Sequence, residues 1–187
     1  DAIQHAAYGH VIHTEPRDMY SPRCISIGAG LPETSPAFQV NRLCGSGLQA
    51  IVSATQLIKL GDCNTALAGG VEVMSRGPYV LPAQRWGARM GDSNVIDMMT
   101  GALHDPFGIG HMGITAENIA ADYGISREDM DQLSAQSQAR AARASEAGYF
   151  KGQITPLELT ARRKTVTFDN DEFIRAETTT ESLASLR

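Results

Sequence analysis

Hydrophobic and polar positions change their period along the chain, and the changes predict an α/β unit in its first half. Residues 36–40 form a short extended run, and residues 65–74 form a second run of small residues suited to burial on both faces. Between them apolar residues recur at helical spacing and end at Gly61. A strand, a helix and a strand in this order predict a βαβ unit with parallel strands and a right-handed crossover. The helical repeat consists of Leu48, Ile51, Val52, Thr55 and Ile58.

The same patterns assign the flanking segments. Ser126 followed by Asp129 indicates a capped helix start, and Gly148 is placed to end that helix. Residues 76–99 are rich in glycine and proline, which predicts a long irregular excursion of the kind that is functional or bound to a neighbour. We expect strands over 1–13, 154–159 and 165–168, and helices over 23–29, 113–124 and 126–148.

Composition narrows the class of protein. Hydrophobic residues make up 42% and charged residues 20% of the chain, and no apolar run approaches the ~20 residues that a membrane helix needs. A formal net charge of -5 argues against nucleic acid as a partner. Three cysteines are too few for a disulfide framework, so a reducing cytoplasm is the expected setting.

The length of 187 residues allows one ordinary domain and a second small one. The chain starts at Asp1 without a methionine, and we expect it to be a piece of a longer protein. Catalytic partners of any residue found here would then lie elsewhere in that protein.

Cys44 is the candidate nucleophile, because it stands where the predicted strand turns into the predicted helix. The N–H groups and the positive dipole end of a helix favour a thiolate at such a corner. Gly45 and Gly47 leave the approach uncrowded, and Ser46 brings a hydroxyl where apolar packing is expected. Free cysteines are more often buried small hydrophobes, but these features favour a reactive thiol.

Two other groups of residues are less informative. His10 and His13 suggest a metal site, but on a strand positions three apart face opposite sides, so we predict no metal site. The basic cluster at residues 162–164 is interpreted as a solvated surface turn.

Three segments together resemble the thiolase family, and most closely its bacterial β-ketothiolase or acetyl-CoA acetyltransferase branch. They are Asn41 to Gly47 (NRLCGSG), Ala68-Gly69-Gly70 with Met74-Ser75, and His111 to Asn118 (HMGITAEN). The first and third segments, in this order and at this separation, are highly specific, and the similarity runs over nearly the whole chain.

The resemblance implies an α/β thiolase-like fold with two related halves, of which this chain holds only amino-terminal parts. Residues 1–75 would be most of the amino-terminal half, which carries the nucleophile. Residues 76–187 would be the inserted α+β loop domain, which covers coenzyme A and makes oligomer contacts. The carboxyl-terminal half, with the family's second cysteine and its activating histidine, would be absent.

For activity, the resemblance implies an acyltransferase in which Cys44 takes up the acyl group, with its backbone N–H in the oxyanion hole. The reaction would be thiolytic cleavage of 3-ketoacyl-CoA or condensation of acetyl-CoA, within fatty acid metabolism. Coenzyme A would be substrate or product, with no tightly bound cofactor, and the protein would be a homo-oligomer, either a dimer or a tetramer. The matching substrate-binding positions are His111, Met112, Leu103 and Arg187.

Two alternatives stay open. A ketosynthase-type condensing enzyme also has a cysteine at such a corner, although the HMG segment and the long insertion argue against it. A non-catalytic fragment that binds coenzyme A or assists assembly is the other. The isolated chain is expected to lack thiolysis activity.

Overall fold

In the computed structural model, which describes residues 2–161 and 164–186, the chain divides into two compact units. Unit 1 spans residues 1–112 and unit 2 spans residues 113–187. The division at residue 112 reflects compactness alone, so the predicted boundary of an inserted domain near residue 75 stays a prediction. The helices and strands of unit 1 are β1 (His5–Gly9), α1 (Ser21–Gly28), β2 (Ala37–Val40), α2 (Ser46–Leu60), β3 (Ala66–Gly70), β4 (Tyr79–Val80), β5 (Ile96–Asp97) and α3 (Met98–Ala102), with 3-10 turns at Pro16–Tyr20, Met74–Arg76 and Pro82–Trp86.

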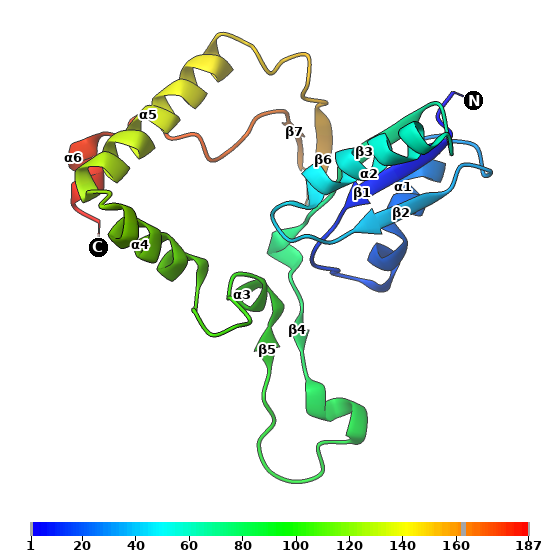
Figure 1. Ribbon diagram of the computed structural model, residues 1–187, viewed down its shortest axis with the longest axis horizontal. Coiled ribbons are helices and arrows are strands. Elements are labelled where there is room, and N and C mark those ends of the chain that lie inside the picture. Colours follow the sequence, from blue (N-terminus) through cyan, green and yellow to red (C-terminus); the bar gives the residue numbers. More distant parts are fainter. Residues whose placement is uncertain (1, 162–163, 187) are drawn as a thin grey trace. The chain divides into compact units, whose positions relative to one another are not determined.

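A three-stranded parallel sheet in the order β2-β1-β3 is the centre of unit 1 (Figure 1). β1 pairs in parallel with both neighbours, so the predicted βαβ unit is confirmed, but its two strands are separated by β1. The strands consist mostly of small residues, and Ala6 and Ala7 of β1 are completely buried. This composition lets helices approach the sheet closely.

Helix α2 covers one face of the sheet and α1 contacts the other. In β1, Ala7 packs with Ala50 and Ala54 of α2, and Phe38 and Ala68 from the neighbouring strands pack against this cluster. Alternate residues point the opposite way: Gln39 of β2 accepts a hydrogen bond from the Ser21 hydroxyl of α1, 3.1 Å away. Cys44 therefore lies just before the N-terminus of a helix that packs on the sheet.

The apolar repeat that predicted α2 does not face this sheet. The buried positions of α2 are Ser46, Ala50 and Ala54, whereas Leu48 is 68% and Ile51 54% exposed. Only small side chains fit where α2 crosses β1 and β3. The periodicity indicated the helix correctly, and Gly61, with φ of 82°, ends it as predicted.

The predicted strand over residues 1–13 is wrong beyond Gly9, where β1 ends. His10 and His13 therefore lie in an irregular segment, and their rings come together at a centroid distance of 4.8 Å. The argument that they face opposite sides fails, because it assumed strand geometry. Within the described ranges, no group of three or more His, Cys, Asp or Glu residues could hold a metal ion.

Unit 2 contains α4 (Met112–Tyr123) except for its first residue, α5 (Arg127–Glu146), the antiparallel pair β6 (Leu157–Ala161) and β7 (Lys164–Phe168), and α6 (Thr180–Ala184). The two predicted helices are confirmed within a few residues. The two predicted strands are confirmed as the hairpin β6–β7, although β6 begins and ends a few residues later than predicted. Residues 162 and 163 lie outside the described part, so the interpretation of the basic cluster stays a prediction. In the described ranges no helix is long and apolar enough to cross a membrane.

Candidate active site

The corner at Cys44 is held by hydrogen bonds within the loop itself. The Ser46 hydroxyl accepts from the Arg42 N–H at 2.9 Å and donates to the Leu43 carbonyl at 2.6 Å. The Asn41 side chain accepts from the Leu43 N–H at 3.0 Å. Ser46 is only 5% exposed, which explains the hydroxyl that the sequence placed there. The Ser46 side chain therefore binds the backbone of Arg42 and Leu43, the two residues before Cys44.

Leu43 adopts a backbone conformation that most residues avoid. Its φ is 49°, the one positive value for a residue other than glycine in the described ranges. Such a conformation costs about 1–2 kcal/mol and has to be enforced by the surroundings. It makes the chain turn sharply, so that Cys44 is exposed immediately before the N-cap Gly45 of α2.

Gly9, at the end of β1, lets this corner approach the sheet. A Cβ atom at Gly9 would lie 2.8 Å from the carbonyl carbon of Ser46 and 3.0 Å from the N of Gly47. Both atoms belong to the backbone of α2 and cannot turn away. Only glycine therefore allows the first turn of α2 to rest on the end of β1.

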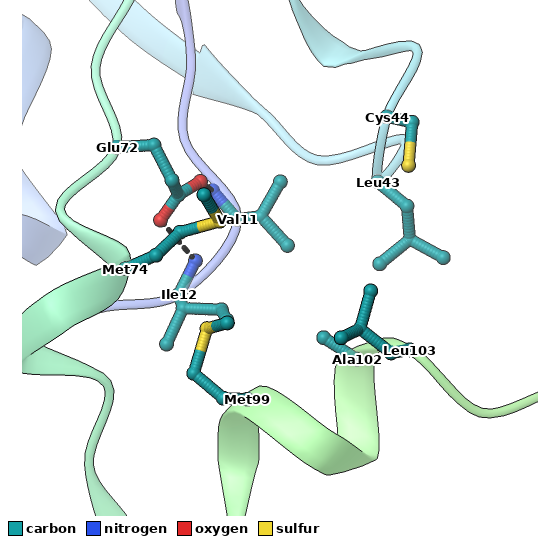
Figure 2. A pocket seen from close by; sticks show the side chains of 9 residues that line it. All are labelled: Val11, Ile12, Leu43, Cys44, Glu72, Met74, Met99, Ala102 and Leu103. Atoms are coloured by element: carbon teal, nitrogen blue, oxygen red, sulfur yellow. Dashed lines mark hydrogen bonds between the residues drawn. The ribbon is translucent and has the colours of Figure 1, made fainter. Parts of the chain in front are cut away.

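A pocket of about 210 Å³ opens beside Cys44 (Figure 2). Its lining comes from four parts of unit 1 and is apolar except for one carboxylate. Figure 2 shows Leu43 and Cys44 on one side, Glu72 on the other, and residues of α3 and its end below. The lining residues are Val11, Ile12, Leu43, Cys44, Glu72, Met74, Met99, Ala102 and Leu103.

Helix α3 is short and is held by a side-chain cap. The Asp97 carboxylate accepts from the Met99 N–H at 2.8 Å and from the Thr100 hydroxyl at 2.9 Å. The hydrogen bond from the Thr100 hydroxyl, followed by the backbone bonds, lowers the pKa of Asp97, against the opposing effect of desolvation. The cap positions Met99 and Ala102, which line the pocket.

Leu103, His111 and Met112 are joined by one small loop. The Met112 N–H donates to the Leu103 carbonyl at 2.9 Å, and the Asp105 N–H donates to the Gly110 carbonyl at 2.8 Å. His104 and His111 face each other edge to face, with ring centroids 5.3 Å apart. Leu103 shares the pocket with Cys44, whereas His111 and Met112 stand beside that pocket's Leu103 wall without lining the pocket.

The remaining candidates are less connected to this site. Arg187 lies outside the described residues. Cys63 is buried, and Cys24 lines a different, more polar pocket together with His10 and Asp18.

Sequence reasoning did not identify most residues of the pocket wall, and three of them form the side opposite Cys44. Glu72 lines the pocket beside Val11 and Ile12, which follow the end of β1. A usable signal existed, because Glu72 stands two residues after Gly70, the last residue of a small-residue strand, and ligands meet parallel sheets at the carboxyl ends of their strands. Val11 and Ile12 gave no such signal, since the end of β1 at Gly9 was not recognised.

Comparison with known proteins identifies the class. The family described as "Thiolase, N-terminal domain" matches residues 1–187. The chain therefore belongs to the thiolase family, and its α/β architecture is that of the amino-terminal part of the thiolase fold.

Particular relatives agree with this assignment. The chain is 54% identical over 187 residues to the β-ketothiolase BktB of Cupriavidus necator, covering 100% of this chain and 48% of that protein. It is 46% identical over 162 residues to an acetyl-CoA acetyltransferase of Escherichia coli (strain K12), covering 85% of this chain and 41% of that protein. The chain thus spans about half the length of these curated relatives.

Solved structures give the same answer for the fold. The Bacillus anthracis acetyl-CoA acetyltransferase superposes with a TM-score of 0.91 at 39% identity, covering 100% of this chain and 47% of that one. Human mitochondrial 3-ketoacyl-CoA thiolase in complex with CoA superposes with a TM-score of 0.91 at 35% identity, covering 99% of this chain and 46% of that one. The predicted family and fold class are confirmed.

Proposed function

We propose that the protein containing this chain is a thiolase-type acyltransferase and that Cys44 carries the acyl group. The Cys44 thiolate attacks the thioester carbonyl of an acyl-CoA or the C3 keto carbonyl of a 3-ketoacyl-CoA. The carbon–sulfur or carbon–carbon bond then breaks, and a thioester to Cys44 remains. The leaving group departs as the thiolate of coenzyme A in the first case and as the enolate of an acyl-CoA in the second. Transfer of the acyl group to a second substrate completes condensation or thiolysis.

One observation carries this proposal. An exposed thiol stands at a strained corner before a helix, and it opens onto an apolar pocket. The corner gives access to the sulfur, the helix start favours a developing negative charge, and the apolar lining suits an acyl chain. The Cys44 N–H is proposed as a donor to the oxyanion that forms during attack.

The substrate contacts belong to the same proposal. Leu103 would contact the acyl-CoA from the covering loop, His111 would lie beside its pantetheine part, and Met112 would contact its acyl group. Arg187 stays a sequence-based candidate for the adenine end. Coenzyme A bound to a human relative supports this class of ligand. A cytoplasmic homo-oligomer acting in fatty acid metabolism is the proposed setting.

The second candidate function is binding of coenzyme A without turnover. It stays open because the chain spans about half the length of its relatives. The ketosynthase-type alternative lacks comparable support, because the thiolase family match covers residues 1–187.

The test uses the longest natural polypeptide that carries this chain. Brief incubation with acetyl-CoA should leave an acetyl group on the peptide containing Cys44, detected by mass spectrometry and released by neutral hydroxylamine, as expected for a thioester. Cys44→Ala should remove the label, whereas Cys24→Ala and Cys63→Ala should keep it. A label that persists in Cys44→Ala would contradict the assignment, and its absence from the unmodified protein would favour the non-catalytic alternative.

A further inference from the structure

The pocket wall opposite Cys44 is a short piece of backbone that lies beyond the sheet. The last sheet-like bonds at the end of β1 are from the His10 N–H to the Val40 carbonyl and from the Val71 N–H to the Gly9 carbonyl. Val11 and Ile12 follow these bonds, and both line the pocket. Their backbone N–H groups need acceptors from outside the strand ladder.

A single side chain supplies both acceptors. The two oxygens of Glu72 are divided between the two amides: Oε2 accepts from the Val11 N–H at 2.9 Å, and Oε1 accepts from the Ile12 N–H at 3.1 Å. Figure 2 shows both bonds, with Val11 and Ile12 between Glu72 and the Leu43–Cys44 side of the pocket. Glu72 therefore binds both amides of this wall.

The carboxylate is itself held in place. Glu72 follows β3 directly after Val71, whose N–H still bonds to β1. Its side chain is 30% exposed, and its Oε1 lies 3.9 Å from Nε2 of the buried His10. Nδ1 of His10 is in turn 3.0 Å from the Ser21 hydroxyl of α1. The wall is thus connected to β3 through Glu72 and, through His10, to α1.

We propose that Glu72 is a positioning residue of the acyl pocket, which holds Val11 and Ile12 at a fixed distance from Cys44 and so determines the acyl chain length that the enzyme prefers. This inference rests on the proposed function, because it needs an acyl group on Cys44. Glu72 does not have to touch the reacting atoms. It acts through the two backbone amides that it binds.

Two substitutions at this position should move the wall in opposite directions. Glu72→Gln replaces one acceptor oxygen by an NH₂ group, which then faces a backbone N–H and pushes the wall toward Cys44. Glu72→Asp keeps both oxygens on a side chain that is one methylene shorter, which draws the wall away from Cys44. The first change narrows the pocket and the second widens it.

The experiment measures kcat/KM for thiolysis of acetoacetyl-CoA and of 3-ketohexanoyl-CoA in the intact protein. The ratio of the longer to the shorter substrate should fall about fivefold or more in Glu72→Gln and rise about threefold or more in Glu72→Asp. Glu33→Gln, an exposed carboxylate of the same unit, is the matched control and should leave the ratio unchanged.

Equal losses for both substrates in both variants would mean that Glu72 only supports folding, and an unchanged ratio would also overturn the inference. If Glu72→Gln does not fold, the rise expected in Glu72→Asp still decides the question. Labelling of Cys44 by acetyl-CoA in the unmodified protein separates the two proposals. Without that label the proposed function fails, whereas a labelled protein with an unchanged ratio rejects only the role of Glu72.

Discussion

Helices α2 of unit 1 and α5 of unit 2 were both predicted from the sequence, yet they are held by different means. α5 starts with a complete capping box, in which Ser126 and Asp129 exchange hydrogen bonds between side chain and backbone, and none of its 20 residues is buried. α2 has no side-chain cap at Gly45, but Ser46, Ala50 and Ala54 are buried against the sheet. Local signals define α5, and packing defines α2.

The difference is relevant to Cys44, which stands immediately before the N-cap of α2. A capped start such as that of α5 satisfies the first N–H groups of the helix with its own side chains. At α2 the cap position is a glycine, and the start is fixed by the contact with Gly9 and by the Ser46 hydroxyl. The geometry of the Cys44 corner therefore depends on the sheet beneath it.

The largest effect is expected from a substitution in β1 that disturbs the packing of α2 without changing α2 itself. Gly9→Val places side-chain atoms against the backbone of Ser46 and Gly47, where a Cβ already lies too close. We expect a loss of about 3 kcal/mol in the free energy of unfolding, together with slower alkylation of Cys44 by iodoacetamide. Denaturant titration and mass spectrometry measure the two effects.

Gly28→Val is the control for this substitution. Gly28 ends α1, and a Cβ there meets nothing within 4 Å. The unfolding free energy should change by less than about 0.5 kcal/mol. A similar loss in both variants would show that the close approach of Gly9 to α2 is not what fixes the corner.

The same substitution made in both helices sharpens the comparison. Ala50→Leu inserts three carbons at a position of α2 that is 0% exposed, and should destabilise the protein by about 2 kcal/mol. Ala139→Leu does so on an exposed position of α5 and should change stability by less than about 0.5 kcal/mol, because alanine and leucine have similar helix propensities. Thermal unfolding of the two variants measures the difference, and equal effects would contradict the assignment of α2 as the packed helix.

The smallest expected effect is at the cap of α5. Ser126→Ala removes the acceptor of the Asp129 N–H, at 3.1 Å, and should cost about 1 kcal/mol. Hydrogen exchange in the first turn of α5 should become faster, while the amides of α2 stay unchanged. Ser126→Asp restores an acceptor and should recover most of the protection; equal exchange in both variants would exclude the cap as the cause.

Signals that act over a few residues were sufficient to predict most of the fold. Gly61, Ser126 and Asp129 mark helix ends through their own backbone or side-chain preferences, and these ends agree with the structure. The burial of α2 could not be predicted in the same way. Its large residues form the periodic stripe, but the sheet accepts only Ala50 and Ala54, and this depends on how small the facing strand residues are.

The candidate site was predicted only where its signals act over a few residues. Cys44 was identified because it stands between two elements that the sequence marks clearly. Glu72 was missed, because its partners are the amides of Val11 and Ile12, 61 and 60 residues away in the chain. The convergence of His10 and His13 was also missed, since the end of β1 at Gly9 had no recognisable stop signal.

The unusual backbone of Leu43 has a consequence for how the protein folds during synthesis. A free chain does not hold φ at 49°, because the conformation is unfavourable without the contacts that enforce it. Besides the hydrogen bonds within the loop, these contacts include the first turn of α2 resting on β1, and the sheet is completed by β3, which ends at Gly70. We therefore expect the backbone at Leu43 and Cys44 to be flexible when it leaves the ribosome. It should adopt the folded conformation only after the residues through Gly70 have also been released.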